Sequence, residues 1–384
     1  MMNKILFASP HYFSGYIQVG GHHYATVLSR NNWKVLYCSL YLSPFTLLLG
    51  KDRKDINSRF SNHIHGGEYI NENLLSYVPF TLLPHHNLTI FDKKWFLYNS
   101  YRFTVPSVAG VLQKHGFEDV DVLWLDGPYQ IFWKNTIRYR KSIYRIYDAV
   151  EQFPNTGKNI LDAHEEAIAS SDVVIVTSKV LTNELSSEYK NVNFLYCPNG
   201  VDLSNFLKTD YQEPEEYRGF KGRKALYVGA IDEWFDEDLL MYVADHSPDT
   251  NFMIIGPDRS GKMDSVKRPN IYYLGPRPYS DIPDYMFYAD FGIIPFKSTK
   301  LVRCVNPIKM YEHFSLGKQV ISTSWEELEL SGVPCLLAKN NKDFLDFINS
   351  HEVLNPDRDY LIRYAKENTW ENRLRNTLKL ITDN

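Results

Sequence analysis

Residues 305–321 read Val-Asn-Pro-Ile-Lys-Met-Tyr-Glu-His-Phe-Ser-Leu-Gly-Lys-Gln-Val-Ile, and the rest of the chain can be interpreted outward from them. Asn306 is a residue type that caps helices, and Pro307 suits a first helical turn, where no backbone N–H is needed. Gly317 can adopt the left-handed conformation that ends many helices. The run therefore predicts a short helix that is capped by Asn306 and stops before Gly317.

A predicted strand lies on each side of this helix. Residues 290–296 and 318–323 are short apolar runs of the kind found in buried strands. The helix N-terminus then follows the carboxyl end of a strand, where α/β sheets bind ligands and where backbone N–H groups favour an anion. Lys309 suits a phosphate there, and Glu312 suits a pair of sugar hydroxyls. The alternative is an ordinary capped helix with a surface Lys–Glu pair, which is common at this spacing.

The pattern Pro-x-Lys-x-x-Glu-x-x-x-x-Gly-x-x-Val-Ile in this run resembles the nucleotide-sugar site of GT-B glycosyltransferases. The resemblance implies an α/β fold in which two Rossmann-like, doubly wound parallel-sheet domains face each other across a cleft. It also implies Glu312 on the ribose hydroxyls of the donor and Lys309 near the diphosphate, with Ile308 and Met310 beside them. Within this fold the chain is similar to bacterial polysaccharide enzymes such as the xanthan glucuronosyltransferase and the teichuronic acid transferases.

The resemblance divides the chain into an acceptor-side domain, a donor-binding domain and a terminal helix. These parts are expected at residues 1–203, 204–368 and 369–384, with the terminal helix packed back on the first domain. Residues 198–202, Pro-Asn-Gly-Val-Asp, are turn residues in their own right and resemble the junction between the two domains. The polar stretch 208–223 is interpreted as the linker.

Apolar runs alternate with helical patterns along most of the chain, as expected for parallel sheets. The runs predict strands at 3–9, 33–37, 120–125, 142–147, 171–177 and 193–197 in the first domain, and at 224–229, 251–255 and 270–274 in the second.

Glycines stand where several of these strands end. Gly20 and Gly21 open the first helix without the G-x-G-x-x-G pattern of dinucleotide enzymes, which counts against a dehydrogenase. They resemble the GT-B loop that touches donor phosphate or acceptor, although plain turn chemistry explains glycines too. Gly229 and Gly256 end strands of the second domain, and Tyr279 precedes its next helix. The resemblance implies that these loops approach the diphosphate and the base of the donor.

Composition is that of a globular protein, with 384 residues, 44% hydrophobic and 23% charged. A net charge of −4 argues against a dedicated nucleic-acid binder. The four cysteines show no metal-ligand spacing and are expected to be small buried residues in a reducing compartment. No signal peptide is recognisable at the start, and no run of about 20 apolar residues is present. The expected location is the cytoplasm, with peripheral contact to the inner membrane as an option.

Catalytic residues are predicted from one departure from the family pattern. Many retaining GT-B enzymes carry two glutamates eight positions apart; Glu312 matches the second, but Cys304 occupies the first. An inverting enzyme needs a general base that takes the proton of the acceptor hydroxyl. Asp148, directly after a predicted strand, is the first candidate, with Glu151 and Asp126 as alternatives. Lys309 and the helix N-terminus can stabilise the leaving diphosphate, so metal-independent chemistry on a UDP-sugar is expected.

Two further stretches bear on the acceptor side. Residues 133–145 concentrate Lys and Arg beside aromatics, a face that suits the anionic inner leaflet and a lipid-linked acceptor, or else is simply solvated. Residues 38–110 remain open: they are either an acceptor-side insertion or part of the core.

Three functions are compatible with the sequence. The first is a glycosyltransferase that moves a sugar from a nucleotide diphosphate to a glycan or lipid-linked glycan in bacterial surface polysaccharide synthesis. The second is a UDP-sugar 2-epimerase, which has the same architecture, and the third is a non-catalytic nucleotide-sugar-binding protein.

Overall fold

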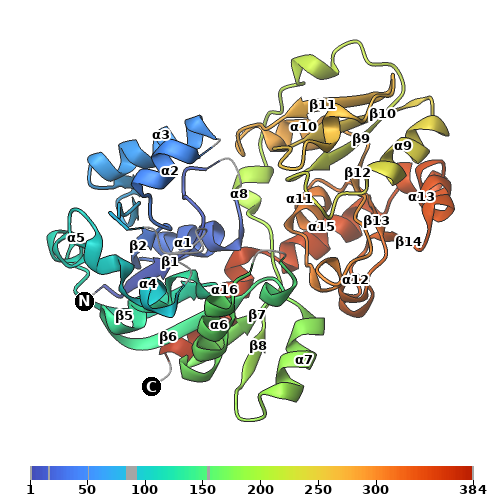
Figure 1. Ribbon diagram of the computed structural model, residues 1–384. Coiled ribbons are helices and arrows are strands. Elements are labelled where there is room, and N and C mark those ends of the chain that lie inside the picture. The colour runs from blue at the N-terminus through green and yellow to red at the C-terminus, as the bar shows by residue number, and fades with distance from the viewer. Residues whose placement is uncertain (1, 16–17, 51, 84–92, 154–155, 383–384) are drawn as a thin grey trace. The chain divides into compact units, whose positions relative to one another are not determined.

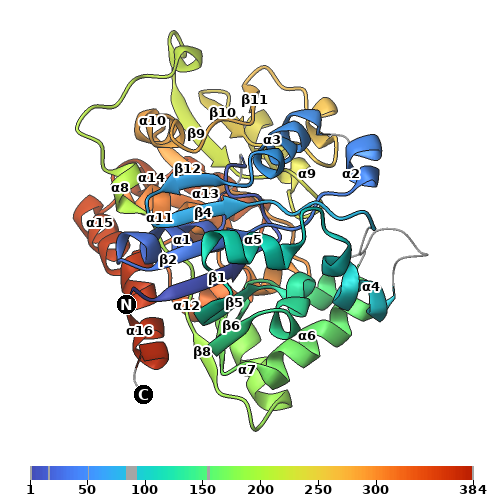
Figure 2. The same ribbon diagram turned by 90° about the vertical axis from the view of Figure 1, so that its left-hand side faces the viewer.

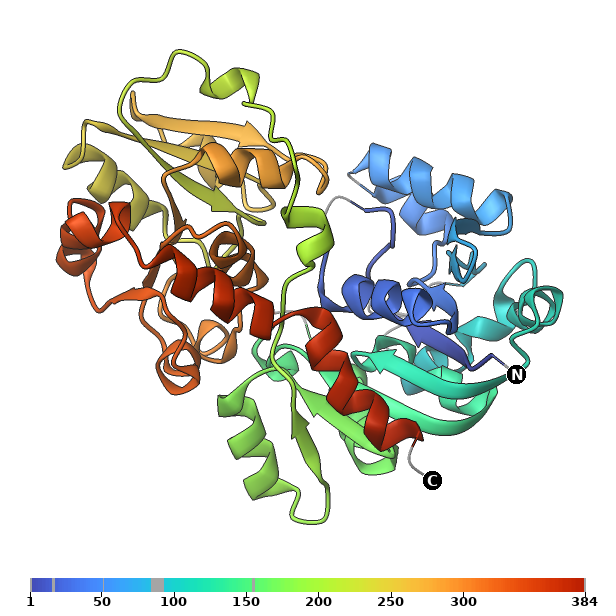
Figure 3. The same cartoon turned by 180° about the vertical axis from the view of Figure 1, so that it is seen from behind.

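The computed structural model contains two compact units (Figure 1). It describes residues 2–15, 18–50, 52–83, 93–153 and 156–382. The first unit comprises residues 1–177, 181–197 and 374–384, and the second comprises 178–180 and 198–373. The N-terminal strand and the end of the last helix therefore belong to the same unit (Figure 3).

An eight-stranded sheet forms the centre of the first unit (Figure 2). The strands follow the order β3-β4-β2-β1-β5-β6-β7-β8, and neighbours are parallel except for β3 and β4. They are β1 (Lys4–Ala8), β2 (Lys34–Cys38), β3 (Glu68–Asn71), β4 (Leu74–Tyr77), β5 (Asp119–Asp126), β6 (Arg138–Ile146), β7 (Val173–Val176) and β8 (Phe194–Tyr196).

Helices connect these strands. Because helices cover a parallel sheet on both faces, its central strands are continuous apolar runs; β7, for example, reads Val-Val-Ile-Val. The helices are α1 (Gly20–Arg30), α2 (Pro44–Leu49), α3 (Arg53–Ile64), α4 (Lys94–Asn99), α5 (Val108–His115), α6 (Lys158–Ser170) and α7 (Lys179–Glu188), with the 3-10 turns η1 (Ser100–Phe103), η2 (Pro128–Asn135) and η3 (Val150–Gln152).

Residues 38–110 contain part of the core. Strand β4 pairs with β2, and all four of its residues are buried. This strand was not predicted, because Leu-Leu-Ser-Tyr is too short and too mixed in composition to show a hydrophobic period. Residues 51 and 84–92 of this region lie outside the described residues.

The second unit holds a six-stranded, fully parallel sheet in the order β11-β10-β9-β12-β13-β14. Numbered from the start of this unit, the order is 3-2-1-4-5-6, that of the dinucleotide-binding Rossmann fold. The strands are β9 (Arg223–Val228), β10 (Thr250–Ile255), β11 (Ile271–Gly275), β12 (Phe291–Ile294), β13 (Val320–Thr323) and β14 (Leu336–Ala338).

The remaining helices accompany this sheet, and none of the helices in the described ranges is both long and apolar enough to cross a membrane. They are α8 (Leu203–Phe206), α9 (Glu237–Asp245), α10 (Ile282–Tyr288), α11 (Ile308–Ser315), α12 (Glu326–Ser331), α13 (Asn341–Ile348), α14 (His351–Leu354) and α15 (Arg358–Glu367), with η4 (Glu215–Tyr217), η5 (Lys262–Asp264) and η6 (Val302–Cys304). The last helix, α16 (Trp370–Thr382), begins in the second unit, and its residues from 374 onward belong to the first.

The stretch 208–223, interpreted from the sequence as a linker, lies inside the second unit instead. Tyr217 within it is 1% exposed, and its ring meets that of Tyr285 edge-on at 5.5 Å between centroids. Although the segment is mostly polar, the buried ring of Tyr217 holds it against the core.

Candidate active site

The strand order of the second sheet marks the place where a ligand is expected. Strands β9 and β12 are neighbours, and the chain leaves them in opposite directions across the sheet. In open α/β sheets, ligands bind outside the carboxyl ends of the strands at such a reversal. Gly229 directly follows β9, and α11 begins after the loop that follows β12. The predicted donor residues of these two segments therefore meet at one edge.

Lys309 extends to this edge over a layer of aromatic rings. Its Nζ lies 4.7 Å from the ring centre of Tyr227 and 5.1 Å from that of Phe296. A Cβ atom at position 229 would lie 2.4 Å from the same Nζ, so only glycine allows this approach. No described residue forms a hydrogen bond with the ammonium. Burial lowers the pKa of Lys309 to about 8, although the charge of Glu312 opposes the shift.

Gly256 supports Gly229 from the neighbouring strand. A Cβ atom at position 256 would lie 1.9 Å from the carbonyl oxygen of Gly229, which no side chain could tolerate. The backbone of Gly256 also has a φ of +144°. The two glycines predicted for donor binding are thus in contact, and Gly229 lies against Lys309.

The side chains of Glu312 and Tyr279 form a direct hydrogen bond. The phenol of Tyr279 donates to Glu312 Oε1 at 2.8 Å, and the glutamate is 5% exposed. Burial raises the pKa of Glu312 to about 7, against the opposing effects of this hydrogen bond and of Lys309. Within the described chain, Glu312 Oε2 receives no hydrogen bond. A buried carboxylate with one open oxygen can accept the hydroxyls of a sugar.

The start of α11 differs from the prediction. Asn306 does not cap the helix, because its Oδ1 accepts hydrogen bonds from the backbone N–H of Asn199 and the hydroxyl of Tyr311, both at 3.2 Å. Pro307 occupies the cap position, and no side chain of the described residues accepts a hydrogen bond from the first turn. The first backbone N–H groups thus have no side-chain acceptor, which favours an anionic ligand.

Two predicted donor residues on this helix have different surroundings. Met310 is fully buried in the core of the second unit, and its predicted donor contact stays a prediction. Ile308, the first residue of α11, is half-buried at the same end as Lys309.

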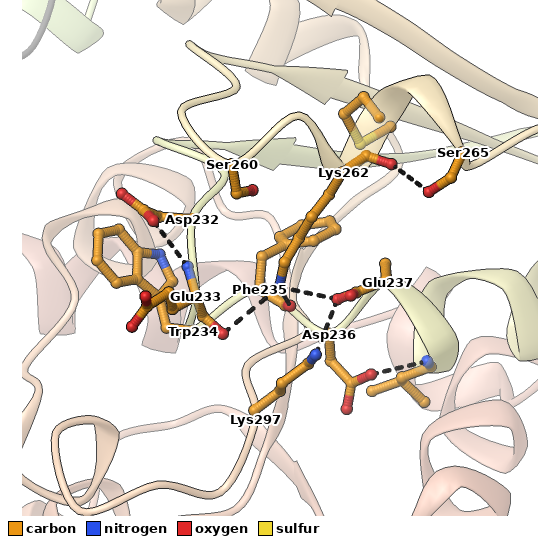
Figure 4. Close-up of polar contacts among 12 residues, drawn as sticks. Asp232, Glu233, Trp234, Phe235, Asp236, Glu237, Ser260, Lys262, Ser265 and Lys297 are labelled. Carbon is orange, nitrogen blue, oxygen red and sulfur yellow. Dashed lines mark hydrogen bonds and ion pairs between the residues drawn. The ribbon is translucent and has the colours of Figure 1, made fainter. Parts of the chain in front are cut away.

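A lysine-centred network ties together the loops that follow β9, β10 and β12, and sequence reasoning did not find it (Figure 4). Lys262 Nζ donates to the carbonyl oxygen of Phe235 at 2.7 Å and to Glu237 Oε2 at 2.9 Å. Lys297 contacts the same Oε2 at 3.0 Å. Asp258 shapes its own loop, because its carboxylate accepts from several backbone N–H groups, including that of Met263 at 2.8 Å. The network could not be predicted from the sequence, because its charged residues lie in loops and have no regular spacing.

We expect Lys262→Met to destabilise the protein by about 1–3 kcal/mol, because the change leaves the Phe235 carbonyl and the Glu237 carboxylate without their shared donor. Urea unfolding followed by circular dichroism measures the difference. Lys297→Met is the matched control and should cost less, since the side chain of Lys297 is 35% exposed and that of Lys262 only 15%. Equal losses would show that Lys262 has no special place in the network.

In the first unit, Gly20 and Gly21 are buried against an ion pair. Arg145 NH1 donates to Asp126 Oδ1 at 2.8 Å, and both side chains are at most 2% exposed. A Cβ atom would lie 2.2 Å from the Arg145 guanidinium at position 20, and 2.4 Å from Asp126 Oδ2 at position 21. Close packing therefore accounts for these two glycines, and their predicted contact with the donor stays a prediction.

Asp148 lies two residues beyond β6, at the carboxyl edge of the first sheet, and is half-buried. Burial raises its pKa to about 7; Arg145 opposes this shift and Asp126 adds to it. A carboxylate with a pKa near neutrality suits a general base. Glu151 is solvent-exposed on η3, and Asp126 is committed to Arg145, so Asp148 is the best placed of the three.

The basic stretch 133–145 is not a free cationic face. It forms the end of η2 and most of strand β6. Arg138 pairs with Asp119 and Arg140 pairs with Asp121, both across the β5–β6 register. Lys134 donates to the carbonyl oxygen of Ser170 at 2.8 Å. Alternation along a strand places cations next to the carboxylates of its neighbour, and this pairing is invisible in one segment of sequence.

No family model matches the chain. TuaH of Bacillus subtilis (strain 168), named for a glycosyltransferase of teichuronic acid biosynthesis, is 27% identical over 178 residues. The match covers 44% of this chain and 45% of TuaH, so the chain spans about half the length of this curated relative.

Solved structures of other proteins resemble nearly the whole chain. A sucrose-phosphate synthase from Thermosynechococcus elongatus has a TM-score of 0.70 at 11% identity and covers 99% of this chain and 98% of its own. HepE of Anabaena, solved with UDP and glucose, has a TM-score of 0.65 at 14% identity, with 99% and 100% covered. A protein assigned as a UDP-N-acetylglucosamine 2-epimerase from Listeria monocytogenes scores lower, at 0.56 with 12% identity over 99% and 96%.

These likenesses show the fold. The chain has two parallel-sheet α/β units of the kind found in GT-B glycosyltransferases, as the sequence predicted.

Proposed function

We propose that this protein is a glycosyltransferase that moves a sugar from a UDP-sugar to a glycan or lipid-linked glycan in bacterial surface polysaccharide synthesis. One observation carries the proposal: Lys309, Gly229 and the Tyr279–Glu312 pair converge at the reversal point of the second sheet. TuaH, named for polysaccharide synthesis, and HepE, solved with UDP, support the same class of donor and product.

In this proposal, the donor is held by α11 and the glycine-ended strands. Glu312 accepts the ribose hydroxyls, and Lys309 lies beside the diphosphate. As the glycosidic bond breaks, negative charge grows on the diphosphate, and an ammonium already held in place stabilises that charge. The N–H groups at the start of α11 add to the effect. That the reaction needs no metal stays a prediction.

The acceptor hydroxyl needs a base, and we assign this role to Asp148. Its carboxylate removes the hydroxyl proton as the oxygen attacks the anomeric carbon, which inverts the configuration at that carbon. Cys304, at the position of the first glutamate of retaining enzymes, is 1% exposed and packed in the second unit, where it offers no contact to a sugar. The missing glutamate and the buried cysteine both favour inversion.

We expect Glu312→Gln to weaken UDP-sugar binding by about 1.5–3 kcal/mol, the usual contribution of a hydrogen bond to a charged group. Isothermal titration calorimetry measures the change. Tyr279→Phe, which removes the partner hydroxyl but keeps the carboxylate, is the control and should have a smaller effect. If the affinity of Glu312→Gln for the UDP-sugar is unchanged, Glu312 does not bind the ribose hydroxyls.

The two other functions make different predictions for one experiment. Incubated with a sugar nucleotide alone, an epimerase changes the sugar, a transferase leaves its configuration unchanged until an acceptor is added, and a binder never changes it. A thermal-shift screen of UDP- and GDP-sugars identifies the donor first, because a ligand of the native state raises apparent stability according to its concentration over Kd. The epimerase is the weaker candidate, since the relative found by sequence is a transferase by name.

The expected location is the cytoplasmic side of the inner membrane, where lipid-linked acceptors are available. The cations of residues 133–145 no longer support membrane contact, because the structure pairs them with carboxylates and carbonyls.

A further inference from the structure

Tyr279, the hydrogen-bond partner of Glu312, lies in a loop whose backbone has few donors. The loop covers residues 276–281, between the end of β11 and the start of α10. Two of its six residues, Pro276 and Pro278, have no backbone N–H. The loop cannot hold its shape through a regular series of backbone hydrogen bonds, so contacts from other segments must fix the position of the Tyr279 phenol.

Lys208 holds the end of this loop. Its Nζ donates to the carbonyl oxygen of Ser280, the residue after Tyr279, at 3.1 Å and to Asp284 Oδ2 on α10 at 2.9 Å. The other carboxylate oxygen of Asp284 accepts from the backbone N–H of Gln212 at 3.2 Å. The side chains of Lys208 and Asp284 are 29% and 18% exposed, so solvent screens this ion pair less than one on the open surface.

Glu216 holds the start of the loop. Its Oε1 accepts from Arg277 NH2 at 2.6 Å and from the phenol of Tyr285 at 3.1 Å. Arg277 Nε also donates to the Tyr285 oxygen at 3.0 Å, so the side chains of η4, the loop and α10 are all bonded to one another. Desolvation would raise the pKa of Glu216, but the hydrogen bonds from Arg277 and Tyr285 outweigh it and lower the pKa. The carboxylate is therefore ionised at neutral pH.

The same part of the chain also contacts Tyr279 directly. Phe206, fully buried at the end of α8, meets the ring of Tyr279 edge-on with 5.9 Å between centroids. Asn205 Nδ2 donates to the carbonyl oxygen of Tyr279 at 3.5 Å. Residues 205–216, here called the bracing segment, continue from α8 beside α10 (Figures 1 and 2). The bracing segment thus contacts Tyr279 and both ends of its loop.

We propose that Lys208 and Glu216 are positioning residues of the donor site and act on the donor through Tyr279. A loop held at both ends keeps the Tyr279 phenol 2.8 Å from Glu312 Oε1, and this hydrogen bond orients the carboxylate before the donor arrives. Without the two contacts, the donor would have to order the loop as it binds, and that cost would lower its affinity. The inference rests on the proposed function, because it requires that Glu312 binds the ribose hydroxyls.

The test is the affinity of the full chain for UDP, measured by isothermal titration calorimetry in a double-mutant cycle. Glu216→Gln and Lys208→Met should each weaken UDP binding by about three- to tenfold, because the loop is then less ordered before binding. In the Tyr279→Phe background, Glu216→Gln should have little further effect, since the hydrogen bond through which Glu216 acts is already missing. Asp245→Asn is the matched control and should bind UDP normally. It weakens a similar carboxylate–arginine pair, with Arg268, which lies before the start of β11, whereas the loop follows the end of that strand.

Three results would overturn the proposal. The first is normal UDP affinity in both Glu216→Gln and Lys208→Met, and the second is a loss in Glu216→Gln that adds in full to the loss in Tyr279→Phe. The third is an equal loss in Asp245→Asn, which would show that any broken ion pair of the second unit weakens UDP binding. Thermal unfolding followed by circular dichroism checks that each variant is folded. Lys208 and Glu216 contact different ends of the loop, so if one variant does not fold, the other still tests the proposal.

A failure of this inference can be told from a failure of the proposed function. If the unmodified protein does not bind UDP, or if Glu312→Gln binds UDP with unchanged affinity, the proposed donor site is wrong and the inference is wrong with it. If Glu312→Gln weakens UDP binding but Glu216→Gln and Lys208→Met do not, the donor site stands and only the role of the bracing segment is wrong.

Discussion

Replacing Asp148 with asparagine is expected to lower sugar transfer by about 10²–10⁴-fold while the donor still binds. Asparagine keeps the shape of the side chain but cannot take up the proton of the acceptor hydroxyl. The position is favoured by its place after β6 and by its pKa of about 7, which burial sets near the pH of the cell. Initial rates at saturating donor, together with donor affinity by calorimetry, measure the two quantities separately.

The pH dependence gives a second measurement on the same residue. The base must be ionised, so kcat/KM should fall as the pH decreases through about 7. Glu312 has a raised pKa of about 7 as well, and its protonation would weaken donor binding over the same range. In Asp148→Asn, the acidic fall should therefore disappear from kcat, where the donor is saturating.

Glu151→Gln is the control for Asp148, because Glu151 occupies the same loop but is exposed. If Asp148→Asn transfers sugar at the normal rate and Glu151→Gln is inactive, the base is Glu151. If both remain active, the inverting mechanism loses its support. Asp126→Asn is a poor control, since it leaves the buried Arg145 without its partner.

The second large effect is expected for Lys309→Met, with a fall in kcat of about 10²–10³-fold and a smaller loss of donor affinity. Methionine can still pack on Tyr227 and Phe296, so the charge is the main thing removed. Because charge grows on the diphosphate only as the bond breaks, the ammonium should matter more to the transition state than to the bound donor. A loss of affinity with unchanged kcat would instead assign Lys309 to binding alone.

Lys309 should also set the alkaline side of the pH profile. Its pKa of about 8 means that the free protein loses this charge as the pH rises through about 8, so kcat/KM should fall there. A bound diphosphate favours the ammonium and raises its pKa, so kcat should fall only at higher pH. Lys309→Arg, which keeps its charge at these pH values, should remove the fall from both profiles.

The arrangement of strands was largely predictable from the sequence, because parallel strands are continuous apolar runs. The bounds of β1, β7, β10 and β13 were predicted to within two residues for this reason. β4 was missed, since four residues are too few to show a period, and it became recognisable only through its pairing with β2. The interpretation of 208–223 as a linker was wrong for a different reason. The segment is polar in composition, but its buried Tyr217 packs it into the second unit.

The candidate site was predicted in part. Lys309 and Glu312 on α11 lie at the same edge of the second sheet as Gly229, Gly256 and Tyr279, which follow strands β9, β10 and β11. Their roles in donor binding stay predictions. Interactions between segments that are distant in the chain could not be predicted from the sequence. One is the hydrogen bond from Asn199 to Asn306, which prevents Asn306 from capping α11. The other is the Lys262–Glu237–Lys297 network, whose loops come together only after folding.

The buried ion pair of the first unit has a consequence for how this chain can change over time. Gly20 lies so close to Arg145 that alanine at position 20 becomes acceptable only if the guanidinium has already gone, and Arg145 in turn cannot go while Asp126 stays charged and buried. The three positions are therefore epistatic: the order of substitution matters, and single steps lead through unstable intermediates. We expect the combination to vary as a unit among homologues, and a double-mutant cycle on positions 20 and 145 to show strong coupling.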